Sequence, residues 1–113
     1  MKIIISSRVK DNIKDIHKYL SKYSMKNANK TIENIYLTID SIKNYSYIVR
    51  YVLELSNKHY RERIYKNFRI IYYVSEKRKT IYILYIFSNK QNLNLFFTIH
   101  KKDFIKFLNQ NFV

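Results

Sequence analysis

The chain has 113 residues, of which 22 are Lys or Arg and 8 are Asp or Glu, so its formal net charge is +14. Hydrophobic residues make up 47% and aromatic residues 17%, which excludes a disordered tail, and the length predicts one domain over residues 1–113. The positive charge indicates a polyanionic or acidic partner, although abundant Lys, Asn, Ile and Tyr are also what AT-rich coding DNA produces.

Residue types that the chain lacks exclude several kinds of site. Without cysteine it can form no disulfide or thiolate metal site, and without glycine it has no glycine-rich phosphate loop. We expect no metal and no cofactor. The uncharged run Thr80–Asn89 is far short of the roughly 20 residues that span a bilayer. We therefore expect a cytoplasmic protein that makes no membrane contact.

The first part of the chain predicts a strand followed by two helices. Residues 2–6 form a short strand that ends at two serines, and Ser7 is expected to cap a helix running to Tyr23. A second helix is predicted over Met25–Lys43, and the very short connection makes the pair an antiparallel hairpin. Lysines recur at every fourth position of the first helix, which predicts a solvated face: Lys10, Lys14, Lys18 and Lys22.

After the hairpin the pattern changes from helical spacing to strands. An extended segment or strand is predicted first, followed by three strands: Val49–Leu55, then Tyr60–Tyr65, Phe68–Val74 and Thr80–Phe87. Arg61 and Arg63 share one face of their strand. The next turn is Lys66-Asn67, where Asn67 is expected to take a positive φ. The last strand is apolar on both faces, which predicts a central position in the sheet.

Together these elements predict an α+β fold of order β-α-α-β-β-β, with a helical hairpin packed on a small, mainly antiparallel sheet. Residues 91–113 are a C-terminal extension of uncertain structure. Their pattern fits an extended piece over Leu93–Ile99 and an extra C-terminal helix over Lys102–Asn111.

Two stretches carry a family resemblance. The first is Arg50-Tyr51-Val52-Leu53-Glu54, and the second runs from Tyr60 to Tyr72 and ends in Phe-Arg-Ile-Ile-Tyr. They resemble the ParE/RelE toxins of bacterial type II toxin–antitoxin modules, more closely on the ParE side, over about residues 2–90. The resemblance implies the fold above and a cognate antitoxin, which would lay acidic and apolar residues along the hairpin and sheet.

The superfamily contains two activities. RelE-like members cut messenger RNA in the ribosomal A site, whereas ParE-like members poison DNA gyrase. If the chain is a ribonuclease, the resemblance assigns catalysis to Arg61, Arg63 and Arg69, which would orient attack by a 2′-hydroxyl and stabilise the phosphate charge. A wider set is expected to bind nucleic acid or the target: Arg50, Lys58, Arg61, Arg63, Arg69 and Lys90.

Departures from the ribonuclease pattern favour the gyrase poison. The last strand is followed by Lys90 where ribonucleases commonly carry Arg, and an ammonium lacks the bidentate fork of a guanidinium. No tyrosine follows Tyr85, and no histidine falls where a general base is expected. A ParE-like gyrase poison is therefore predicted. The alternatives are a ribosome-dependent mRNA endoribonuclease and a degenerate, non-toxic binding module.

Structural roles compete with these functional ones. Glu54 and Glu62 are candidates for ion pairs with the strand arginines. Most tyrosines are expected to pack in the core or along the sheet, because strands favour aromatic residues: Tyr72, Tyr73, Tyr82 and Tyr85.

Overall fold

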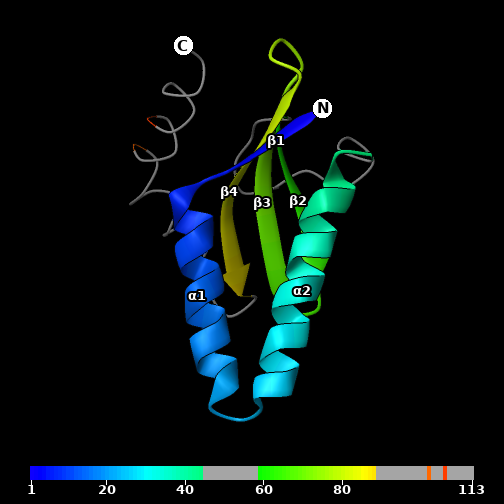
Figure 1. Ribbon diagram of the computed structural model, residues 1–113. Coiled ribbons are helices and arrows are strands. Elements are labelled where there is room, and N and C mark those ends of the chain that lie inside the picture. The colour runs from blue at the N-terminus through cyan, green and yellow to red at the C-terminus, as the bar shows by residue number, and fades with distance from the viewer. Residues whose placement is uncertain (45–58, 89–101, 103–105, 107–113) are drawn as a thin grey trace.

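The computed structural model describes residues 1–44, 59–88, 102 and 106 (Figure 1). The elements follow the predicted order: β1 (Lys2–Ile5), α1 (Ser7–Ser21), α2 (Met25–Ile42), β2 (Tyr60–Tyr65), β3 (Phe68–Ser75) and β4 (Thr80–Ser88). The α+β prediction is thus confirmed.

The four strands form one sheet in the order β1-β4-β3-β2. β1 runs parallel to β4, whereas β3 is antiparallel to both of its neighbours, so the sheet is mainly antiparallel as predicted. β4 lies inside the sheet, and its residues from Thr80 to Phe87 are all buried. The continuous apolar run therefore correctly indicated a strand that is covered on both faces.

Both helices cover the same face of the sheet (Figure 1). The main core lies between the two layers and consists of β-branched and aromatic side chains: Val9 and Ile13 of α1, Ile35, Ile39 and Ile42 of α2, and Ile70, Tyr72, Val74, Ile81, Ile83 and Ile86 of the sheet. The two helices of the hairpin are also joined by an exposed side-chain contact, since His17 Nε2 lies 2.8 Å from Asn29 Oδ1. Burial of these apolar faces is what holds the two layers together.

Two local predictions were wrong by one residue. Ser6, not Ser7, caps α1: its Oγ accepts a hydrogen bond from the Val9 N–H at 3.2 Å. In the turn between β2 and β3, Lys66 takes the positive φ, at 53°, and Asn67 does not. A second positive φ, 52° at Lys79, closes the turn between β3 and β4. With no glycine in the chain, lysines take these left-handed positions.

The predicted solvated face of α1 is confirmed, because Lys10, Lys14 and Lys18 are exposed, as is Lys22, which caps the C-terminal end of the helix. No helix among the described residues is long and apolar enough to cross a membrane. The expected segments over Val49–Leu55 and Leu93–Ile99 lie outside the described residues. Of the expected helix over Lys102–Asn111, only Lys102 and Lys106 are described, and both are helical and exposed.

Candidate functional site

The two arginines of β2 lie on the helix-facing side of the sheet. In the antiparallel register Arg61 pairs with Tyr72 and Arg63 with Ile70, and both partners belong to the core beneath the helices. Directly paired residues share a face. Arg61 and Arg63 therefore share a face as predicted, and that face is covered by α2.

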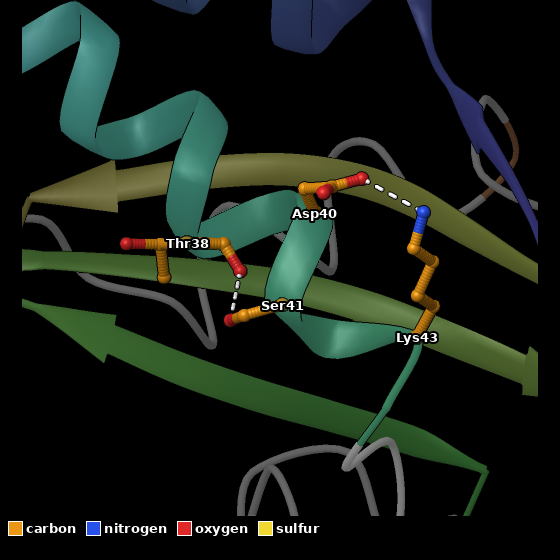
Figure 2. Close-up of polar contacts among 4 residues, drawn as sticks. All are labelled: Thr38, Asp40, Ser41 and Lys43. Atoms are coloured by element: carbon orange, nitrogen blue, oxygen red, sulfur yellow. Dashed lines mark hydrogen bonds and ion pairs between the residues drawn. The ribbon is translucent and has the colours of Figure 1, made fainter.

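The last turns of α2 carry polar side chains toward these arginines. Arg63 Nη1 donates to Ser41 Oγ at 3.3 Å, and Ser41 Oγ in turn donates to the Thr38 carbonyl at 2.7 Å (Figure 2). One turn earlier, Asn34 Nδ2 donates to the Tyr65 hydroxyl at 3.1 Å. We call Asn34, Thr38 and Ser41 the polar stripe of α2. Ser41 and Asn34 join the helix to the edge strand β2 through hydrogen bonds, and the Thr38 hydroxyl donates to the Asn34 carbonyl within the helix.

The outward side of the same turns makes a weaker contact. Lys43 Nζ lies 3.1 Å from Asp40 Oδ1, and both side chains are largely exposed (Figure 2). An exposed pair of this kind stabilises a helix by only a few tenths of a kcal/mol, roughly. The polar stripe, not this ion pair, is what joins the end of α2 to the strand.

Arg61 is more deeply buried than Arg63, with only 7% of its surface exposed. The positive charges of both guanidinium groups interact electrostatically with the hydroxyl of Tyr72, a side chain that is completely buried. Burial raises the pKa of Tyr72 to about 12, although the nearby charges of Arg63 and Arg61 act in the opposite direction. Tyr72 is therefore a neutral core residue at physiological pH.

Arg69 lies on the opposite face of the sheet. It pairs with Ile64 of β2 and Phe87 of β4, and its Nε and Nη2 both lie 2.6 Å from Glu62 Oε2. The Glu62 side chain is almost fully buried, so this is an interior ion pair. The predicted pairing of Glu62 with a strand arginine is thus found at Arg69.

The structure brings together only part of the predicted site. Arg61 and Arg63 lie under α2, whereas Arg69 lies behind the sheet, so the three do not converge on one phosphate. Arg69 is separated from the other two because alternate residues of a strand point to opposite faces, and the roles assigned to the three arginines stay predictions. The remaining predicted site residues, Arg50, Lys58 and Lys90, lie outside the described residues.

The histidines of the described residues make local side-chain contacts. His17 contacts Asn29, and the His59 ring packs against Tyr73 with their centroids 5.6 Å apart. No group of three or more potential metal ligands occurs among the described residues. The third histidine, His100, lies outside them.

Sequence reasoning missed the polar stripe. Its members lie at helical spacing on one side of α2, beside the buried apolar positions Ile35, Ile39 and Ile42. A row of Asn, Thr and Ser next to an apolar stripe is the signal that could have predicted a polar contact between this helix and a strand.

Two comparisons place the chain among known proteins. One family model, described as the ParE toxin of the type II toxin–antitoxin system parDE, matches residues 3–93. Among solved structures, a chain described as the chromosomal ParDE TA system from P. aeruginosa is similar, with a TM-score of 0.64 and 15% identity. That alignment covers 78% of this chain and 95% of the other, and at such low identity it supports the fold alone. No curated protein sequence matches the chain.

Proposed function

The chain belongs to the ParE toxin family of type II toxin–antitoxin systems, and on that basis we propose that it arrests bacterial growth by binding DNA gyrase. In this proposal the toxin acts by binding and performs no chemistry of its own. Gyrase is a cytoplasmic target, so the cytoplasm is the proposed place of action.

The observation that supports binding over catalysis is the separation of the three arginines. Arg63 is hydrogen-bonded to Ser41 of α2 and Arg61 is buried beside it, while Arg69 is held by Glu62 on the other face. A ribonuclease that cuts by 2′-hydroxyl attack needs cations that converge on one phosphate. Arg63 instead joins β2 to α2, and Arg69 joins β3 to β2.

Membership of the family implies an antitoxin partner. We propose that this antitoxin is cognate to the chain and neutralises it by covering the helical hairpin and sheet with acidic and apolar residues. Its acidic residues would offset a formal net charge of +14. Co-expression of the antitoxin is expected to rescue both growth and soluble yield.

The test is inducible expression in a bacterial host, with growth, plasmid supercoiling and mRNA integrity measured side by side. Growth arrest with lost supercoiling and intact mRNA is the expected result. Ribosome-dependent mRNA cuts that disappear in Arg61→Ala with Arg63→Ala, but persist in Lys10→Ala with Lys14→Ala, would establish the endoribonuclease instead. Normal growth in the presence of folded protein would establish a non-toxic binding module.

A further inference from the structure

A cleft lies at one end of the sheet, beneath the helical hairpin. The connected ends of α1 and α2 extend past the ends of β3 and β4 (Figure 1), and the cleft of about 760 Å³ opens between them. This volume falls in the range of roughly 300–1,000 Å³ that is typical of small-molecule sites. Its lining comes from both helices, the β2–β3 turn and the strand ends, so it belongs to no single element.

The lining combines aromatic rings with positive charge. Tyr19 of α1 and Phe68 of β3 supply the rings, and Lys30 of α2 and Lys66 of the turn supply two ammonium groups. Asp15 is the one carboxylate that lines the described part of the cleft. The cleft therefore offers flat apolar surfaces together with an excess of positive charge.

Two contacts orient the rim of the cleft. Tyr19 is 59% exposed, and its ring packs edge-on against Tyr23 with the centroids 5.7 Å apart. On the other side, Lys66 Nζ lies 5.6 Å from the centroid of the Tyr65 ring, a cation–π contact. These contacts hold an aromatic ring and an ammonium group at the opening before any ligand arrives.

We propose that this cleft binds a nucleotide unit, with the base against the aromatic side chains and the phosphate at Lys30 and Lys66. Every nucleobase has a π-face that stacks on aromatic rings without regard to sequence, and ammonium groups hold phosphate as point charges. An acidic peptide would use the charges but not the flat rings. The nucleotide can be free or part of a single strand. The proposal goes beyond gyrase inhibition and does not rest on it.

The test is titration calorimetry on the full chain with two probes, AMP and a short oligothymidylate. Lys30→Glu and Tyr19→Ala should each weaken binding about tenfold. The matched controls are Lys26→Glu and Tyr36→Ala, which change exposed residues of α2 that do not line the cleft. Both are expected to change the dissociation constant less than about twofold. Circular dichroism confirms that each variant is folded.

Each outcome of the titrations either supports or overturns the proposed nucleotide site. Dependence on Lys30 with AMP identifies a free-nucleotide site, and the same dependence with the oligothymidylate alone identifies a site for single strands. Absence of binding to both probes overturns the proposal, as does equal weakening by Lys30→Glu and Lys26→Glu, which would be general charge attraction. Loss of antitoxin binding in the cleft variants, with probe affinity unchanged, would identify a protein-binding groove and overturn it as well.

Discussion

Arg69 and Glu62 form an ion pair on the face of the sheet opposite the helices, with two guanidinium nitrogens 2.6 Å from the same carboxylate oxygen. Only 2% of the Glu62 side chain and 18% of the Arg69 side chain are exposed. In so dry a position the two charges depend on each other, because water cannot replace either partner.

Replacing Arg69 with Met should therefore lower the free energy of unfolding by about 3–5 kcal/mol, because it leaves the Glu62 carboxylate buried without its cation. Urea denaturation of the full chain measures this. Lys77→Met, which removes an exposed cation from the β3–β4 turn, is the control and should be nearly neutral. The double variant Arg69→Met with Glu62→Leu should recover part of the loss, and an unchanged stability in Arg69→Met would show that the pair contributes nothing.

The polar stripe of α2 gives a second prediction. Ser41→Ala removes the acceptor of the Arg63 hydrogen bond and should cost about 1–2 kcal/mol. Ser21→Ala is matched to it, since Ser21 Oγ also donates to a carbonyl three residues earlier, that of Lys18, but at an exposed site. Urea denaturation should show a clear loss for Ser41→Ala and almost none for Ser21→Ala. Equal losses would mean that the contact with the strand adds no stability.

The two helix caps allow a third comparison. Ser6 Oγ accepts from Val9 N–H and donates to the Leu84 carbonyl at 3.0 Å, whereas Ser24 Oγ accepts only from Asn27 N–H among the described contacts. Ser24→Ala should cost about 1 kcal/mol, a usual value for a lost cap. Ser6→Ala should cost about 2 kcal/mol, because it also leaves a buried carbonyl unpaired. Thermal unfolding followed by circular dichroism ranks the two, and the reverse order would contradict the role assigned to the Leu84 contact.

Tyr72 predicts how stability depends on alkaline pH. Its pKa is about 12 in the folded protein and about 10 when exposed, so folding keeps the proton on and its contribution is complete below pH 10. As pH rises from 10 toward 12, stability should fall by about 1.4 kcal/mol per unit from this residue.

Tyr72→Phe has no proton to lose at this position, so the difference in stability between it and the original chain isolates the contribution of Tyr72. Urea denaturation at a series of pH values should show that, above pH 10, the original chain loses stability relative to Tyr72→Phe. Parallel curves for the two proteins would contradict the raised pKa.

Much of the fold could be predicted because the decisive patterns are local. Alternation located β2, and continuous apolar residues placed β4 inside the sheet. The choice between Ser6 and Ser7 as cap could not be made this way, since both serines fit the helix start equally. The contact that distinguishes Ser6 is its hydrogen bond to Leu84, a residue far along the chain.

The placement of the arginines shows a different limit. That Arg61 and Arg63 share a face follows from the strand period of two residues. A two-residue turn pairs Tyr65 with Phe68, and that register alone puts Arg69 opposite Ile64 and hence on the other face. The sequence contained enough information to separate Arg69 from the other two. Local sequence patterns could not predict which face of the sheet α2 covers, because that depends on how the helical hairpin packs.

The parallel pairing of β1 with β4 has a consequence for synthesis on the ribosome. Lys2 pairs with Thr80 and Ile5 with Ile83. The first strand to be synthesised, β1, therefore cannot pair until β4 has also been synthesised. Pairings between distant segments form late, because the intervening chain must first be closed into a loop. A nascent chain that stops before β4 leaves β1 without a partner strand and the helical hairpin without the middle of its sheet. A chain whose translation stops before β4 is therefore expected to yield no folded toxin.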